Sequence, residues 1–279
     1  MKFLQKIGKP RANKKSLFNS IIRFFTNKRQ TFIFFVIILS VGLFIAEFIL
    51  GKSGILIVLI LSFLTSFFLY LSLKEDLKGN FTPQVLILPF FYSLAIGLFY
   101  LLVPARLLTR VGMTFLYAFG LYSLFLSQNI FTVSAIRTIQ LLSGARTVSL
   151  VLTLLSYFFI SNVVFSFHIN VFLTLALVAI YTFPLVLQSI WTYTLEKSLL
   201  AQSFWVSSIT LCLVEVAAFL WLNSSTPTVI ALFLTAIFYV TLGLAHAWFE
   251  RRLFRSVILE YFWVTAISFI FLILFSGWF

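Results

Sequence analysis

Residues 31–50 read TFIFFVIILSVGLFIAEFIL, and residues 54–73 read GILIVLILSFLTSFFLYLSL. A stretch of about 20 predominantly apolar residues is long enough to cross the hydrocarbon core of a bilayer as a helix. Because lipid offers no hydrogen bonds to the backbone, a spanning segment must satisfy its own amide groups, and a helix does so. These two stretches therefore predict transmembrane helices.

Seven more apolar stretches of comparable length follow, with only short polar segments between them. The nine predicted spans are 31–50, 54–73, 84–103, 111–130, 147–167, 169–190, 200–222, 227–248 and 257–279. The chain is 62% hydrophobic and 10% charged, whereas soluble chains carry roughly 25% charged residues. The expected fold class is therefore all-α, a polytopic transmembrane helix bundle that forms a single domain over residues 31–279.

A basic head, residues 1–30, precedes the first span. Its nine basic residues are Lys2, Lys6, Lys9, Arg11, Lys14, Lys15, Arg23, Lys28 and Arg29. Apolar residues recur at helical spacing between Leu17 and Phe25, which is typical of a short amphipathic helix lying in the membrane interface. Two roles stay open for the head: an anchor that orients the first span, or an arm that senses anionic lipid or docks a partner. The first span is too long for the apolar core of a cleavable signal peptide.

The 20 Lys and Arg residues give a net charge of +13, but they lie in short segments beside the apolar spans. This placement argues against nucleic-acid binding and is typical of the bias that orients membrane helices. With a cytoplasmic N-terminus, 17 basic residues lie inside and three, Lys52, Arg106 and Arg110, lie outside. We therefore expect an external C-terminus, a plasma-membrane location and contact with the anionic cytoplasmic leaflet.

Four charged residues share the predicted outer side. Glu47 lies near the outer end of the first span and Glu215 in the outer half of the seventh, while Arg106 and Arg110 lie between the third and fourth. Ionisable groups within a membrane usually face the bundle interior, and the guanidinium fork suits a carboxylate or a phosphate. If the helices bring the four together, they form an anion or lipid-headgroup site. The alternative is that the glutamates pair with arginines or hydroxyls to fix helix register, or that Glu47 extends to the interface.

A second polar group lies on the predicted cytoplasmic side. His246 and Glu250 are four residues apart and therefore share one helix face, and Glu260 follows in the last span. A histidine beside carboxylates can relay protons, and a salt-bridge cluster at the helix end is the alternative. His168 lies in an outer turn, so the two histidines are too far apart to share a metal ion.

Motifs for catalysis and cofactor binding are missing from the sequence. It has no clustered carboxylates for magnesium and a diphosphate, no His-Glu-x-x-His run, no Gly-x-Ser-x-Gly elbow and no Walker glycine loop. Cys212 is the single cysteine, which excludes an internal disulfide and a thiolate metal cluster. We therefore expect neither a cofactor nor a metal ion.

Two local features bear on how the helices are connected and packed. Segment 131–146 is the longest internal loop and is predicted to be a connector, a re-entrant piece or a short interfacial helix. Gly42 with Ala46, and Gly243 with Ala247, are small residues four apart, a spacing that favours close helix approach.

These observations favour a non-enzymatic membrane protein: a subunit of a membrane complex with a protein partner, a lipid-handling protein, or a small permease for transport. The alternative is a membrane-embedded enzyme that acts on a lipid-linked or anionic substrate at the outer leaflet through the four outer charged residues. A channel is disfavoured, because the sequence shows no ring of charges and no filter-like loop.

Overall fold

The computed structural model describes residues 28–50, 54–74, 82–104, 106–134, 140–195, 202–222 and 225–275, except for the side chains of 47–50. Within these ranges there is no strand, and nine helices are long and apolar enough to cross a membrane. The prediction of an all-α bundle with nine spans is therefore confirmed. The predicted head lies outside the described residues, apart from its last three.

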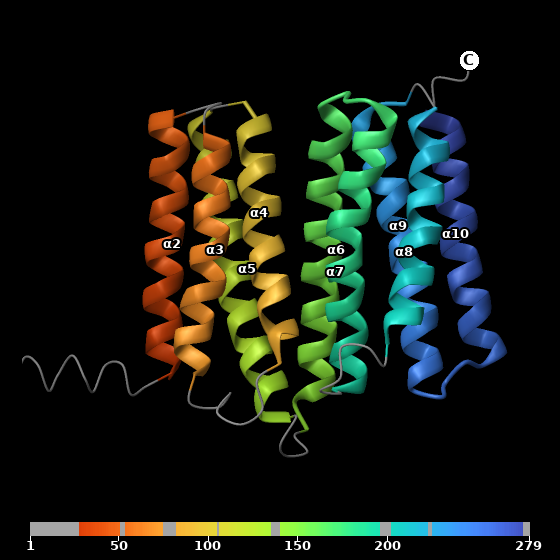
Figure 1. The fold of residues 1–279 in the computed structure, drawn as a ribbon, viewed down its shortest axis with the longest axis horizontal. Helices are drawn as coiled ribbons and strands as arrows, with labels where there is room; N and C mark the ends of the chain where they lie inside the picture. Colours follow the sequence, from red (N-terminus) through yellow and green to blue (C-terminus); the bar gives the residue numbers. More distant parts are fainter. Residues whose placement is uncertain are drawn as a thin grey trace, which may run out of the picture.

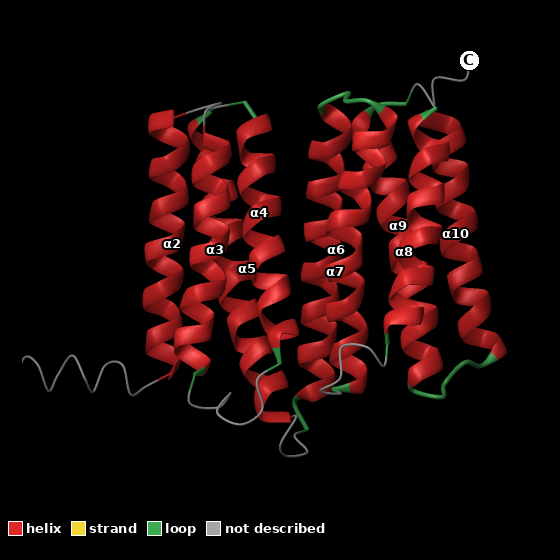
Figure 2. Cartoon of the chain, in the orientation of Figure 1, coloured by secondary structure: helices red, strands yellow, loops and turns green. Residues whose placement is uncertain are grey.

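The helices are α2 (Lys28–Leu50), α3 (Ile55–Leu73), α4 (Ile87–Leu102), α5 (Leu107–Ser134), α6 (Leu142–Ser166), α7 (Val171–Thr194), α8 (Ser203–Trp221), α9 (Pro227–Phe249) and α10 (Arg255–Phe275). A single 3₁₀ turn, η2 (Pro83–Leu86), leads into α4. Successive helices run in opposite directions, and they form two groups side by side, α2 to α5 and α6 to α10 (Figures 1 and 2). Helix α6 joins the groups, because it packs against α4 and α5 on one side and against α7 and α9 on the other.

The helix ends define two faces. On the basic face, drawn at the bottom of Figure 1, α2, α4, α6, α8 and α10 begin and the other helices end. Its described basic residues are Lys28, Arg29, Lys74, Arg146, Arg251, Arg252 and Arg255. The opposite face carries Arg106 and Arg110 at the start of α5. Among the described residues, positive charge is therefore concentrated at one end of the bundle.

The bundle has an apolar outside and a partly polar inside. Phe172 is 88% exposed, whereas the side chains of Ser93 and Thr182 are fully buried. Many buried hydroxyls donate to the carbonyl oxygen four residues earlier in their own helix, as Ser62 does to Val58 at 2.8 Å. This distribution is the one that lipid favours, because an exposed polar group has no partner there.

The predicted loop at 131–146 is wrong in its extent. Helix α5 continues to Ser134, and α6 begins at Leu142. The side chains of Gln128 and Phe131 are fully buried, and the Thr132 hydroxyl donates back to the carbonyl oxygens of Gln128, at 3.2 Å, and Asn129, at 2.8 Å. The polar residues of this segment are therefore buried or bonded within α5. Their polarity suggests that the helix ends there, but α5 continues past them.

Candidate functional site

The four outer charged residues of the sequence analysis do not form one group. Arg106 and Arg110 lie one turn apart at the start of α5, and the Arg110 amide donates to the Arg106 carbonyl at 3.0 Å. Glu215 is exposed on α8, which belongs to the other helix group and packs against α7 and α9. Glu47 lies in the last turn of α2, which packs against α5, and its side chain is outside the described part of the chain. Among the side chains that the structure describes, it thus brings the two arginines together and places Glu215 in the other helix group.

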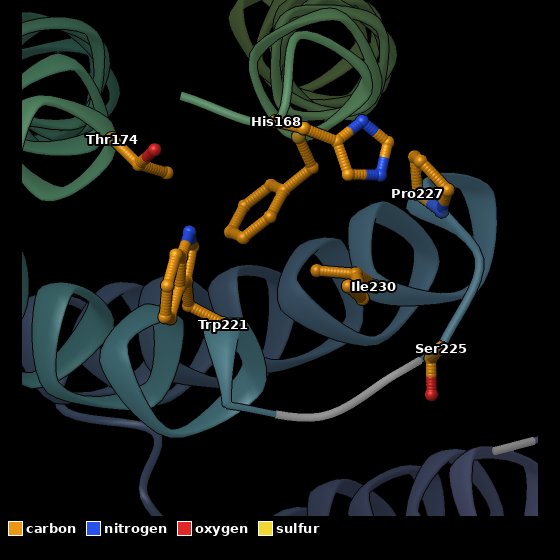
Figure 3. A pocket seen from close by; sticks show the side chains of 7 residues that line it. His168, Thr174, Trp221, Ser225, Pro227 and Ile230 are labelled. Carbon is orange, nitrogen blue, oxygen red and sulfur yellow. The ribbon is translucent and has the colours of Figure 1, made fainter. Parts of the chain in front are cut away.

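A small pocket of about 210 Å³ opens at the opposite face, where α6, α7, α8 and α9 meet (Figure 3). Its lining residues are Phe165, His168, Thr174, Trp221, Ser225, Pro227 and Ile230. In Figure 3 the His168 ring lies beside Pro227, and Trp221 and Thr174 lie across the pocket from it. The volume is below the roughly 300–1,000 Å³ of typical ligand sites, so the pocket suits only a very small molecule.

His168 is the one ionisable residue among the described residues that line this pocket. Its backbone is left-handed, with φ of 47°, and its Nδ1 lies 2.9 Å from the Ser166 carbonyl oxygen. That contact makes Nδ1 the donor, because a carbonyl oxygen only accepts. Within the described ranges, His, Cys, Asp and Glu residues form no group of three that could hold a metal ion. The lining therefore offers hydrogen bonds and no paired acid and base.

A denser polar network lies at the basic face and centres on Arg146, in the first turns of α6. Its guanidinium donates to the Glu250 carboxylate at 3.1 Å, to the Thr192 carbonyl at 3.1 Å and to the Tyr193 carbonyl at 3.2 Å. The same guanidinium lies 4.6 Å from the centre of the Tyr193 ring. The last carbonyls of a helix have no partner within it, so Arg146 caps the C-terminal end of α7 and ties it to α9.

His246 extends this network into the bundle. It is 5% exposed, its Nε2 lies 3.1 Å from the Ser189 hydroxyl, and its ring stacks on Tyr193 with 3.8 Å between centres. Glu250, one turn further on, is paired with Arg146 at 3.1 Å and with Arg252 at 3.8 Å. Glu260 is exposed on α10. The His246 hydrogen bond thus goes to Ser189, and the carboxylate of Glu250 is held by arginines.

A larger hollow, an apolar groove of about 500 Å³, lies between α8, α9 and α10. Its lining residues are Trp205, Ser208, Ile209, Cys212, Thr241, Leu244, Ala245, Trp248, Leu253 and Ile258. Helices α8 and α10 both pack on α9, and the groove lies where α9 forms its floor. Trp205 and Trp248, whose ring centres are 6.1 Å apart, mark its end at the basic face, the depth at which tryptophan favours the membrane interface.

The comparisons with known proteins give a family and no activity. The family described as "Protein of unknown function (DUF5656)" matches residues 27–275. No curated protein and no solved structure matches the chain. The matched range contains all of the described helices, from the start of α2 to the end of α10. The chain therefore belongs to the DUF5656 family of proteins of unknown function.

Proposed function

We propose that this chain is a non-enzymatic, lipid-handling membrane protein whose groove between α8, α9 and α10 holds an acyl chain of an anionic phospholipid. The observation that carries the proposal is an apolar groove of about 500 Å³ that ends beside an arginine-rich turn. Its volume is within the roughly 300–1,000 Å³ of small-molecule sites. An apolar groove that faces lipid accepts the acyl chain of any membrane lipid. The preference for one lipid headgroup therefore depends on the arginine-rich turn.

The turn between α9 and α10 supplies the charge. Arg251 and Arg252 follow α9, Arg255 begins α10, and all three are exposed. Leu253 lies between these arginines and itself lines the groove. Arginine presents a planar fork that matches phosphate geometry. A lipid phosphate at this turn therefore leaves its acyl chain at the mouth of the groove.

Two carboxylates, Glu250 and Glu260, lie near this turn. Glu250 is paired with Arg146 of α6 at 3.1 Å and, more loosely, with Arg252 of the turn at 3.8 Å. Glu260 lies two residues after the groove-lining Ile258, which is roughly 200° further round a helix of 3.6 residues per turn. Arg252 therefore makes one long ion pair and keeps a side chain that is 73% exposed, and Arg251 and Arg255 form no ion pair with a described carboxylate.

The charge distribution supports a location for the lipid. Seven of the nine described Lys and Arg residues lie at the end of the bundle that carries this turn, and basic loops favour the cytoplasm. In this orientation the groove opens to the cytoplasmic leaflet of the plasma membrane. That leaflet carries anionic lipids, and each nearby Lys or Arg adds about 1 kcal/mol of attraction.

Filling the groove tests the proposal. Cys212 lines the groove and is exposed, whereas its neighbour Leu211 is 62% exposed and does not line it. Native mass spectrometry of the purified full chain with added phosphatidylglycerol measures how many lipids it retains. We expect Cys212→Trp to lose a retained lipid and the matched control Leu211→Trp to keep it, with equal unfolding temperatures. Undiminished retention by Cys212→Trp contradicts the proposal.

Removing the charge tests the headgroup contact separately. The triple variant Arg251→Gln, Arg252→Gln and Arg255→Gln is expected to retain phosphatidylglycerol and phosphatidylcholine equally, whereas the unaltered protein prefers phosphatidylglycerol. The control is Arg106→Gln with Arg110→Gln, which removes positive charge at the opposite face. If both variants lose the preference for phosphatidylglycerol equally, that preference depends on net charge alone, and the proposed headgroup site is refuted.

A further inference from the structure

Four buried side chains near the basic face carry polar atoms without a hydrogen-bond partner among the described residues. They are Oε1 of Gln84, Oε1 and Nε2 of Gln128, Oε1 of Gln188 and Nε1 of Trp191. None of the four side chains is more than 1% exposed. Leaving a buried donor or acceptor unsatisfied costs about 1–3 kcal/mol. We therefore expect a bound molecule to supply the missing hydrogen bonds of these four residues.

The helix geometry places the two central glutamines at one level. Phe131 of α5 and Trp191 of α7 meet edge to face, with ring centres 6.2 Å apart. Helices α5 and α7 both run towards the basic face. Gln128 and Gln188 each lie three residues before these rings, which is about one turn deeper into the bundle on the same helix side. Gln128 and Gln188 therefore lie at matching depth on two helices that meet through the Phe131 and Trp191 rings.

Other elements close the site. Gln84 lies in η2, which packs against α5 and α7. The Gln188 amide donates to the Ser149 hydroxyl of α6 at 3.3 Å. Oδ1 of Asn129 and Oγ of Ser134 are buried without a partner among the described residues, further along α5. Both residues belong to α5, which ends at the basic face.

The chemistry of these unpartnered polar groups indicates which molecule can bind between them. The amides, the indole and the hydroxyl are uncharged and include both donors and acceptors. An ion loses its hydration on entering such a site without gaining a counter-charge, whereas water both donates and accepts. We infer that water molecules occupy a buried site between α5, α7 and η2, hydrogen-bonded to Gln84, Gln128, Gln188 and Trp191. This inference does not depend on the lipid groove, which lies between other helices.

Radiolytic footprinting tests directly whether water is bound at this site, because X-rays convert bound water into hydroxyl radicals that oxidise the nearest side chains. In proteoliposomes of the full chain, we expect Trp191 to be oxidised although it is 1% exposed. The double variant Gln128→Met and Gln188→Met removes the amides at similar volume and is expected to lower Trp191 oxidation several-fold. The control is Leu124→Met, one turn from Gln128 on α5 and likewise buried, which leaves the oxidation unchanged.

A thermal measurement covers the case in which the double variant folds poorly. If water satisfies the amides, Gln128→Met leaves the unfolding temperature unchanged or lowers it. If the site is dry, the same change removes an unsatisfied polar group and raises the unfolding temperature. Trp191 that stays unoxidised in the unaltered protein, or a raised unfolding temperature for Gln128→Met, overturns the inference.

Discussion

Arg146 and Glu250 are 104 residues apart in sequence, and their side chains meet at 3.1 Å at the basic face. Arg146 belongs to the start of α6, and Glu250 directly follows α9 as its C-terminal cap. The guanidinium also caps the last turn of α7 through two backbone carbonyls. One side chain therefore joins the ends of three helices at the edge of the membrane.

We expect Arg146→Gln to lower the free energy of unfolding by about 1.5–3 kcal/mol, the range for hydrogen bonds to charged groups. The loss arises because Glu250 and two helix-end carbonyls lose their donor together. Arg146→Lys is expected to recover only part of the stability, because a single ammonium does not reproduce the planar fork. Thermal unfolding of the protein in lipid nanodiscs measures both.

Arg252→Gln is the matched control for this prediction. Arg252 approaches the same carboxylate at 3.8 Å, but its side chain is 73% exposed, against 18% for Arg146. Exposed pairs contribute between about 0 and 1 kcal/mol, so this variant is expected to unfold almost like the unaltered protein. Equal destabilisation by the two substitutions is incompatible with a special role for Arg146.

The sequence predicts where each helix lies along the chain better than it predicts which helices pack against one another. The length of each apolar run is enough to place the nine spans, because lipid imposes that length on every one of them. The spacing of His246 and Glu250 is enough to place them on one face of α9. Nothing in the spacing indicates Arg146 as the partner of Glu250, because that pairing depends on how α6 packs against α9. For the same reason the outer set is dispersed: Glu215 lies in the second helix group, away from Arg106.

Gly120 of α5 predicts a second measurable effect. The Tyr92 hydroxyl donates to the Leu116 carbonyl at 2.8 Å, and a Cβ at Gly120 collides with the Tyr92 ring and its hydroxyl. Gly120→Ala is therefore expected to lower the free energy of unfolding by about 1–3 kcal/mol, the usual cost of overpacking. Thermal unfolding again provides the measurement.

Gly112 is the control on the same helix, because a Cβ there meets nothing within 4 Å. Gly112→Ala is expected to be neutral or to stabilise the protein by up to about 1 kcal/mol through helix propensity. If both alanine variants behave alike, the close approach of Tyr92 to α5 is not a feature of the folded protein.

A hydroxyl cluster in the first helix group makes a third prediction. The Tyr117 hydroxyl lies 2.9 Å from the Ser93 hydroxyl and 3.3 Å from that of Thr65, and all three side chains are fully buried. Tyr117→Phe removes the oxygen shared by α3, α4 and α5, so we expect a loss of about 1 kcal/mol in unfolding free energy. Tyr122→Phe, on the same helix but only partly buried, is expected to cost less. A larger loss for Tyr122→Phe than for Tyr117→Phe contradicts the importance of the cluster.

The orientation of the bundle is open to a test that uses two arginines from opposite faces. In a Cys212→Ser background, the engineered substitutions Arg106→Cys and Arg252→Cys each leave one thiol, at positions that are both exposed. Because basic loops favour the cytoplasm, a membrane-impermeant maleimide added to intact cells is expected to label the protein carrying Arg106→Cys. The protein carrying Arg252→Cys is expected to react only after the cells are broken. The reverse labelling pattern means that the bundle has the opposite orientation in the membrane. The arginine turn and its groove then lie in the outer leaflet, where the anionic lipid of our proposal is not concentrated.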